Sequence, residues 1–206
     1  MRDDSSRCNL VTCLFHPMAR ASTSNRVRII GGEWRSRLIE FPDAEGLRPT
    51  PDRVRETLFN WLGQDLTGLR CLDLYAGAGA LGFEALSRHA AHVTMIESSA
   101  PVHKALGANA ERLGTGTRLR LHKGDALEFL RADSGQYDLV FLDPPYGSGL
   151  LARTWPILKL RLAANAWVYA ENDNALNFDP DWVVRKSGRA GSVHYYLLEQ
   201  RTDEHE

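Results

Sequence analysis

The stretch LDLYAGAGALGFEALSRHA, Leu72–Ala90, decides the fold of this chain. An apolar run typical of a strand comes first, glycines follow at Gly77, Gly79 and Gly82, and helical apolar spacing continues after them. This G-x-G-x-x-G spacing predicts a strand, a tight turn and a helix, because the glycines let the backbone turn sharply and approach a ligand closely. Both dinucleotides and S-adenosylmethionine (SAM) bind to such a turn, so the glycines alone leave the ligand open.

Asp73 favours SAM over a dinucleotide. It lies inside the expected strand, four residues before Gly77, where its negative charge would repel a pyrophosphate. SAM carries an ammonium and a sulfonium, and a carboxylate can pair with the ammonium directly or through a water. The alternative interpretation is an aspartate that only caps the turn with its side chain.

The composition fits a single catalytic domain. Lysine plus arginine (25) nearly balance aspartate plus glutamate (26) in 206 residues, so net charge gives no sign of nucleic-acid binding. Three cysteines are too few for a disulfide framework, and Cys8, Cys13 and His16 lack a fourth metal ligand, so we expect no metal. No apolar run approaches the roughly twenty residues that cross a bilayer. We therefore expect a cytoplasmic, monomeric protein without membrane contact.

Four segments are expected along the chain. Residues 1–25 show no periodicity and are predicted to be a disordered extension, or to lie upstream of a true start at Met18. A hairpin and a helix are expected over 26–66, and the catalytic domain over 67–200. The polar tail 201–206 is expected to fray.

The segment RVRIIGGEWRSRLIEFP, residues 26–42, alternates like a hairpin with a turn or bulge at Gly31 and Gly32. Its arginines exceed its acidic residues, and together with Trp34 they suit phosphate contact and base stacking. The alternative is a plain solvated hairpin face.

A helix is expected to follow, with Thr50 as N-cap, Pro51 at the first helical position and Gly63 at the end. Its buried stripe is predicted at Val54, Leu58, Phe59 and Leu62, with Arg53, Arg55 and Glu56 facing elsewhere. Arg48, just ahead of the helix, could reach a phosphate or the cofactor, or could simply be exposed to solvent.

Strands and helices alternate beyond the glycine motif, which predicts βαβ units and a mostly parallel sheet. A closing hairpin, with arms on either side of SGRAG, predicts an antiparallel end to this sheet. The expected strands are 92–97, 117–123, 137–143, 166–170, 182–186 and 192–198, and the expected helices are 100–113, 126–131 and 150–162.

Acidic residues end two of these strands, on the edge where parallel sheets bind ligands. Glu97 could accept hydrogen bonds from both hydroxyls of a ribose. Asp125 could accept from an adenine amino group, while the N–H of Ala126 meets a ring nitrogen. Taken singly, either acid could be an ordinary turn or N-cap residue, but their occurrence at successive strand ends strengthens the cofactor interpretation.

The motif DPPY, Asp143 to Tyr146, follows the next strand. Two prolines fix an extended backbone that lacks donors, so the Asp143 carboxylate and the Pro144 carbonyl offer two acceptors to a planar exocyclic amine. Tyr146 supplies a ring to stack on the base. We expect these acceptors to hold the amine for in-line methyl transfer, without a strong general base. A structural Pro-Pro turn is the alternative.

The chain resembles the bacterial small-subunit ribosomal RNA guanine-N(2) methyltransferases of the RsmD type. The likeness covers about Arg26 to Gln200 and rests on RIIGGEWRSR, LRPTPDRVRETLFNWL, LDLYAGAGALGFEALSR and DPPY, in that order. It implies an α/β class I SAM-dependent methyltransferase fold: Rossmann-like, with a mostly parallel seven-stranded sheet, an antiparallel C-terminal hairpin and a small N-terminal hairpin and helix. It also implies SAM as methyl donor and 16S rRNA, within an assembled or partly assembled small subunit, as partner.

The resemblance also assigns residue roles. The catalytic group would be Asp143, Pro144 and Tyr146; the cofactor group Asp73, Gly77, Gly79, Glu97 and Asp125; and the RNA-contacting group the N-terminal arginines, here Arg28, Arg35, Arg37, Arg48 and Arg53. We also expect Tyr75 and Ala126 to bind the cofactor. Ala78 stands where the family commonly has serine, and Tyr75 where it has phenylalanine.

Three other functions remain open at this point. A DNA adenine amino methyltransferase would use the same DPPY pocket, an NAD(P) oxidoreductase shares the glycine turn, and an RNA-binding protein could retain an inactive SAM fold. The sequence leaves undecided which guanine is modified and whether naked RNA suffices.

Overall fold

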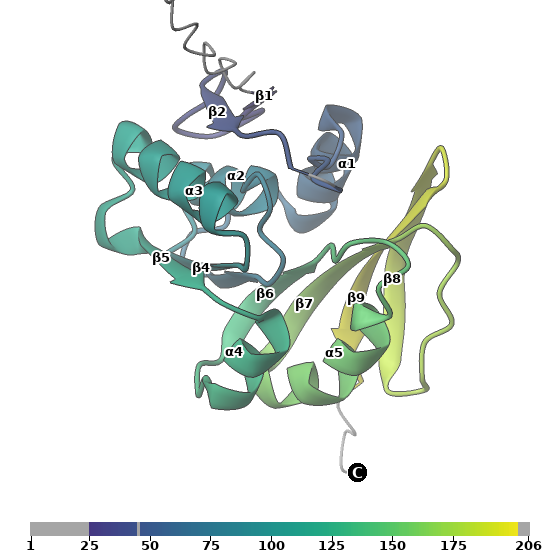
Figure 1. Cartoon of the computed structure of the whole chain (residues 1–206). Helices are drawn as coiled ribbons and strands as arrows, with labels where there is room; N and C mark the ends of the chain where they lie inside the picture. The colour runs from purple at the N-terminus through teal and green to yellow at the C-terminus, as the bar shows by residue number, and fades with distance from the viewer. Residues whose placement is uncertain (1–24, 45, 202–206) are drawn as a thin grey trace, which may run out of the picture.

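A mixed sheet of seven strands forms the centre of the computed structural model, which describes residues 25–44 and 46–201 (Figure 1). The predictions for Met18, for Cys8, Cys13 and His16, and for the tail beyond Arg201 lie outside these residues. The strand order is β5-β4-β3-β6-β7-β9-β8. The strands are β3 (Arg70–Asp73), β4 (His92–Glu97), β5 (Leu119–Lys123), β6 (Tyr137–Leu142), β7 (Leu162–Asn172), β8 (Trp182–Ala190) and β9 (Val193–Gln200).

The direction of the strands agrees with the sequence prediction. The five strands from β3 to β7 pair in parallel, while β9 pairs antiparallel with both β7 and β8. The predicted α/β fold, with a mostly parallel seven-stranded sheet and an antiparallel C-terminal hairpin, is confirmed. The predicted bounds of β4 and of the helix after it are also correct.

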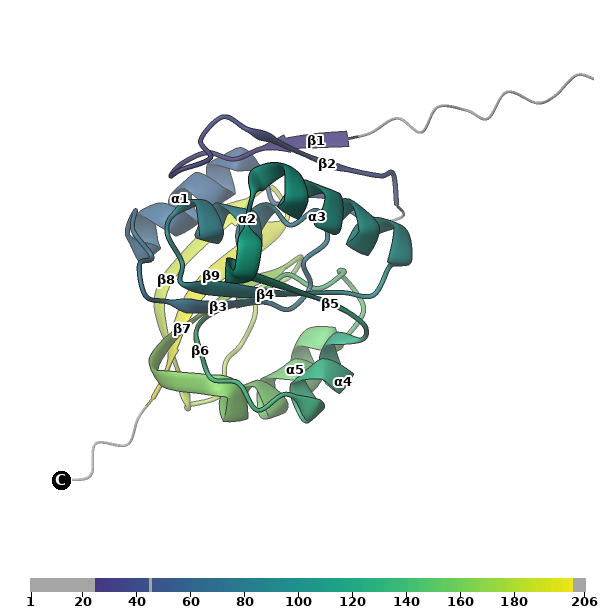
Figure 2. The ribbon, with the colours of Figure 1, turned by 90° about the vertical axis from the view of Figure 1, so that its left-hand side faces the viewer.

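Helices cover both faces of the sheet (Figure 2). On one face lie α1 (Asp52–Leu62), α2 (Ala80–Ser87) and α3 (Ala100–Leu113); on the other lie α4 (Ala126–Ala132) and α5 (Leu150–Leu158). Short 3₁₀ turns precede β5 (η1, Gly116–Arg118) and β7 (η2, Lys159–Arg161). Successive strand residues alternate between the two cores: Cys71 packs toward the first face and Leu72 toward the second.

The N-terminal hairpin, β1 (Asn25–Arg28) with β2 (Leu38–Phe41), lies over α2 and α3 (Figure 2). The glycine segment of this hairpin turns the chain and also contacts the end of α2. The N–H of Glu33 donates to the carbonyl of Ser87 (2.7 Å), and a Cβ on Gly32, whose φ is +75°, would lie 1.9 Å from that carbonyl oxygen. The hairpin therefore shares one hydrophobic core with the helices beneath it.

The prediction for α1 was wrong at Thr50, at Pro51, which precedes the first helical residue Asp52, and at Arg55. Thr50 is not the N-cap: Pro51 holds that position, and the Thr50 carbonyl accepts from Nε of Arg55 (3.1 Å). Arg55 does not face solvent but is fully buried. Its guanidinium lies between Asp52 and Glu84, so burial is stabilised by opposite charge that helical periodicity cannot reveal.

Other differences concern where strands begin and end. Most of SGRAG is strand and not turn, because β8 continues to Ala190 and the chain reverses at Gly191 and Ser192. Gly188 lies against the ring of Tyr195, where a Cβ would be 2.4 Å from the nearest ring atom. In the first hairpin, Ser36 has a φ of +68°, so the second arm starts at Leu38 and not in the arginine-rich segment before it.

Candidate active site

One pocket, of about 630 Å³, lies at the carboxyl ends of the parallel strands. Its walls come from the glycine turn after β3, the ends of β4 and β5, the DPPY segment after β6 and the loop before α1. This volume suits a ligand the size of a nucleoside derivative. All the predicted cofactor residues except Gly79 line it, together with Arg48, Asp143, Pro144 and Tyr146.

The glycine turn is held by close packing. Gly79 caps α2 with a φ of +78°, and a Cβ there would lie 2.6 Å from Leu106 and 2.7 Å from Phe83. Gly77 also has a positive φ (+50°), and its N–H donates to Oε2 of Glu97 (3.0 Å). Gly79 therefore shapes the turn from behind, whereas Gly77 lies on the wall of the pocket.

Glu97 joins the end of β4 to this turn. Its Oε2 accepts from Gly77, and its Oε1 accepts from the N–H of Ser99 (2.6 Å). Each carboxylate oxygen can accept a further hydrogen bond. The side chain is thus fixed in orientation and still able to receive hydroxyl groups, as the ribose prediction requires.

Asp73 is 3% exposed, and its Oδ2 accepts from the N–H of Gly82 (3.0 Å). Burial raises the pKa of this carboxyl to about 7; the Gly82 bond opposes that rise, and the charge of Glu97 adds to it. Asp73 thus does cap the turn, while its pairing with a cofactor stays a prediction. The ionised form of this buried carboxyl has few stabilising partners in the protein. A positively charged ligand in the pocket would stabilise it, so the site favours a cation.

Asp125 is the N-cap of α4. Its Oδ1 accepts from the N–H groups of Leu127 and Glu128, both at 2.9 Å. Within the described residues Oδ2 makes no recorded bond, so it can accept from a ligand. Ala126 occupies the first helical position, where the N–H has no partner inside the helix. The two hydrogen-bonding roles predicted for this pair are compatible with the cap.

Tyr75 is locked in place from the other face of the sheet. Its hydroxyl shares a hydrogen bond with Oγ1 of Thr154 on α5 (2.7 Å). The tyrosine found where phenylalanine is common thus gains a partner for its hydroxyl.

The DPPY segment combines a half-buried acid, a buried proline and an exposed ring. Oδ2 of Asp143 accepts a long hydrogen bond from the Thr50 hydroxyl (3.4 Å). Burial raises the pKa of Asp143 well above its usual range, and the charges of Glu171 and Asp73 raise it further. Tyr146 is 46% exposed at the mouth of the pocket, so its ring is available to a planar group.

Sequence reasoning missed Thr50 and Glu171. Thr50 had been assigned to helix capping, although it contacts the DPPY acid. Glu171 follows the apolar run AWVYA just as Glu97 follows HVTMI, so an acid at a strand end was the signal that could have found it.

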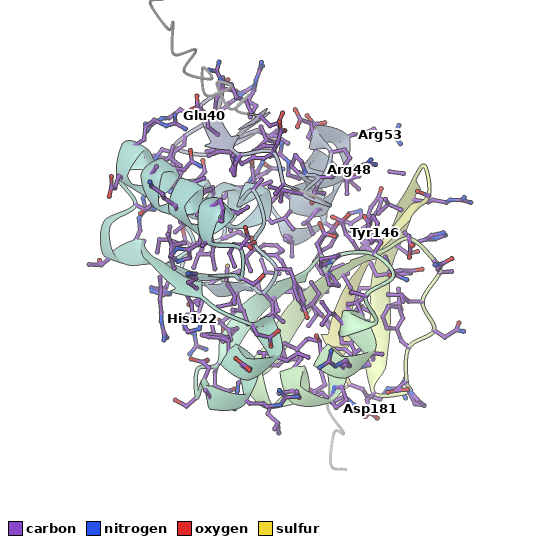
Figure 3. The ribbon with its side chains drawn as sticks, in the orientation of Figure 1. Glu40, Arg48, Arg53, His122, Tyr146 and Asp181 are labelled. Carbon is purple, nitrogen blue, oxygen red and sulfur yellow. The ribbon has the colours of Figure 1, made fainter. Side chains whose placement is uncertain are left out.

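The predicted RNA-contacting arginines fall in two places. Arg28, Arg35 and Arg37 are exposed on the hairpin, where Arg37 donates to the carbonyl of Arg112 on α3. Arg48 lines the pocket, and Figure 3 shows Arg53 on the same side of the molecule as Arg48 and Tyr146.

Two kinds of feature are absent from the described part of the chain. Residues 25–44 and 46–201 contain no group of three or more His, Cys, Asp or Glu side chains that could hold a metal. Over the same residues, no helix has both the length and the apolarity needed to span a bilayer.

The fold and the pocket define a class I methyltransferase, and comparisons with known proteins agree. The solved structure "Putative methyltransferase yhhF from Escherichia coli" superposes with a TM-score of 0.77 at 41% identity, over 87% of this chain and 100% of that one. An RNA methyltransferase from Salinibacter ruber, solved in complex with S-adenosyl-L-homocysteine, shares the fold (TM-score 0.59, 22% identity, 77% of this chain and 98% of that one).

Sequence relatives define the family. The "Ribosomal RNA small subunit methyltransferase D" of Escherichia coli K12 is 44% identical over 184 residues, covering 87% of this chain and 92% of the relative. The protein of the same name from Haemophilus influenzae is 39% identical over 192 residues, covering 88% and 100%. The family model "Conserved hypothetical protein 95" matches residues 27–199. The chain belongs to the ribosomal RNA small subunit methyltransferase D family.

Proposed function

We propose that this enzyme transfers a methyl group from SAM to the exocyclic N2 amine of a guanine in small-subunit (16S) ribosomal RNA. The observation that carries the proposal is the single pocket in which an acid-lined glycine turn faces a DPPY segment. The names of the relatives support ribosomal RNA as the substrate.

The residues at the glycine turn fit SAM. When bound, SAM supplies a methyl group on a positively charged sulfonium. Asp73 would pair with its ammonium, Glu97 would accept from the ribose hydroxyls, and Asp125 with Ala126 would meet the adenine edge. These carboxyls make the pocket unfavourable for the pyrophosphate of NAD(P), because like charges would lie close together at low dielectric.

The DPPY residues fit a planar amine. The Asp143 carboxylate and the Pro144 carbonyl would accept its two hydrogens, which orients the nitrogen lone pair and favours a tetrahedral nitrogen. Tyr146 would stack on the base, which must leave its own stack to enter the pocket. Arg48 and Arg53 would contact phosphates at the mouth, and the hairpin arginines would extend this contact.

A DNA adenine amino methyltransferase would need the same amine pocket. Such enzymes usually carry a sizeable separate segment that recognises the target sequence. The described chain offers little room for one, because the hairpin, α1 and the sheet share one packed core. Ribosomal RNA is therefore favoured over DNA.

Mass spectrometry of ribosomal RNA tests the proposal. RNA from cells that lack this gene should lose one methyl group, on the N2 of a single small-subunit guanine, and the purified protein with SAM should restore it. Incubations with naked 16S rRNA, small subunits and unmethylated DNA identify the substrate. Transfer to DNA alone, or an unchanged rRNA methylation pattern in the deletion strain, would contradict the proposal.

A further inference from the structure

A second buried acid lies behind the DPPY segment. Glu171, near the carboxyl end of β7, is 1% exposed and does not line the pocket. Its Oε1 accepts from the hydroxyl of Tyr169 (2.8 Å). None of the ion pairs recorded among the described residues includes Glu171. A carboxyl buried without a cation is costly, so its presence calls for a functional explanation.

Strand register brings Glu171 next to Asp143. Leu142 at the end of β6 pairs with Ala170 on β7, so the following residues, Asp143 and Glu171, lie on neighbouring chains and point to the same side. The hydroxyl of Thr50 is within hydrogen-bonding reach of both carboxyls. Asp143 lines the pocket, whereas Glu171 does not.

Neighbouring carboxyls, one buried and one half-buried, do not ionise independently. The groups that face them are also unable to neutralise them. Asp73 on β3 is acidic, and Tyr146 in the DPPY segment and Tyr169 on β7 are phenols whose pKa is raised, mainly by burial. Arg48 and Glu97 line other parts of the same pocket. The pair therefore holds one proton more readily than two separate carboxyls would.

We propose that Glu171 is a positioning residue that acts through Asp143: together with Thr50 it orients the Asp143 carboxyl, and its charge makes Asp143 a stronger proton acceptor for the substrate amine. This inference rests on the proposed methyl transfer. It assigns a second acid to the amine half of the site, in addition to the DPPY aspartate.

The proton step follows directly. Once the amine has gained its methyl group, it carries one proton too many. An N–H bond breaks, its electron pair stays on nitrogen, and the proton forms an O–H bond with the Asp143 carboxylate. The proton then leaves to water through the open mouth beside Tyr146. Asp143 must be ionised before this step, and the neighbouring charge of Glu171 strengthens its affinity for the departing proton.

The test compares wild type with Glu171→Gln, which removes the charge and keeps the shape. In the full-length protein without RNA, a ¹³C NMR titration of aspartate carboxyl carbons, with Asp143 assigned by an Asp143→Asn variant, reports the midpoint of Asp143. Glu171→Gln should lower this midpoint by about one pH unit or more, as expected when a close like charge is removed. An unchanged midpoint would overturn the proposal.

Two further variants keep the test informative if Glu171→Gln does not fold. Glu171→Asp keeps the charge and should keep the midpoint of Asp143 raised. Tyr169→Phe removes the bond that stabilises ionised Glu171, shifts the shared proton toward Glu171 and should lower the Asp143 midpoint by less than Glu171→Gln does. If Glu171→Gln does not fold, a midpoint in Tyr169→Phe equal to that of wild type counts against the proposal.

Single-turnover methyl transfer gives the second readout. In Glu171→Gln the acidic limb of the pH–rate profile should shift to lower pH by the same amount as the NMR midpoint. The rate constant at the plateau should fall, because Asp143 becomes a weaker proton acceptor. A purely structural role would lower stability and leave the limb in place. Because the NMR titration needs no RNA, a wrong assignment of the RNA substrate would leave the titration result intact.

Discussion

Arg55 on α1 and Glu84 on α2 form a fully buried ion pair, with Nη1 of the guanidinium 3.3 Å from Oε2 of the carboxylate. Glu84 also accepts from Arg88 (2.8 Å) and from the N–H groups of Ile30 and Gly31 (both 2.8 Å). One carboxylate thus fastens the N-terminal hairpin, α1 and the helix that follows the glycine turn.

Glu84→Gln should therefore destabilise the whole protein. The amide cannot balance two buried guanidinium groups, and losing one partner of a buried ion pair typically costs about 3–5 kcal/mol. Urea unfolding followed by circular dichroism measures this loss. Arg185→Gln is the matched control, because Arg185 forms a partly exposed pair with Glu199 and should cost under about 1 kcal/mol. Equal losses in the two variants would contradict the assignment.

Asp143→Ala should lower methyl transfer by at least about 100-fold, because it removes an acceptor that orients the amine. The SAM dissociation constant, measured by calorimetry, should change little, since Asp143 belongs to the amine half of the pocket. Asp181→Ala is the control. This exposed side chain pairs with Lys159 and lies at the opposite end of the molecule from Tyr146 (Figure 3), so activity should persist. An active Asp143→Ala enzyme would exclude the proposed role.

Periodicity and glycine spacing predicted the sheet, because strands buried on both faces and helices with one apolar stripe leave a clear pattern. The same reasoning failed for Arg55, whose position in α1 looks polar. Its burial depends on Glu84, which lies 29 residues further along the chain, and no local pattern encodes a long-range ion pair.

The cofactor half of the pocket was easier to predict than the amine half. Asp73, Glu97 and Asp125 each lie at the end of a strand or next to a glycine motif. Their position in the sequence was therefore enough to predict that they line the pocket. Glu171 carries the same strand-end signal but faces Asp143 only because of the β6–β7 register, which the sequence does not specify.

Arg48→Ala and Arg53→Ala should each weaken binding to small-subunit RNA and lower the slope of log K against log salt by about 1 for each lost phosphate contact. Fluorescence anisotropy at several salt concentrations measures this slope. Arg131→Ala on α4 is the control, because α4 covers the opposite face of the sheet (Figure 2). If all three variants show the same slope as wild type, phosphate contact at the pocket mouth is excluded.

Tyr146→Ala should raise KM for the RNA substrate, since loss of one base–aromatic stack costs about 1–3 kcal/mol, or roughly 5- to 150-fold. Tyr146→Phe should retain near wild-type KM and kcat. Burial raises the pKa of the phenol, so the hydroxyl stays protonated at working pH and takes no part in proton transfer. Steady-state kinetics of both variants decide the point: a Phe variant as impaired as the Ala variant would assign the role to the hydroxyl.

Asp73 should give the ligand-free protein an unusual pH dependence. Its pKa is about 7 when folded and close to 3.8 when unfolded, so between these values the folded state binds more protons. Its contribution to the free energy of unfolding is therefore largest below pH 4 and falls by up to about 1.4 kcal/mol per pH unit until pH 7.

Asp73→Asn keeps an acceptor for Gly82 and removes this dependence of stability on pH. In urea unfolding at pH 5, 6, 7 and 8, the variant should gain stability relative to wild type up to about pH 7 and then level off. It should also bind SAM more weakly, because its amide brings no charge to pair with the ammonium. A constant difference in stability between the two proteins across this range would show that Asp73 is already ionised at pH 5. Unchanged SAM binding by Asp73→Asn would show that the cation is recognised elsewhere.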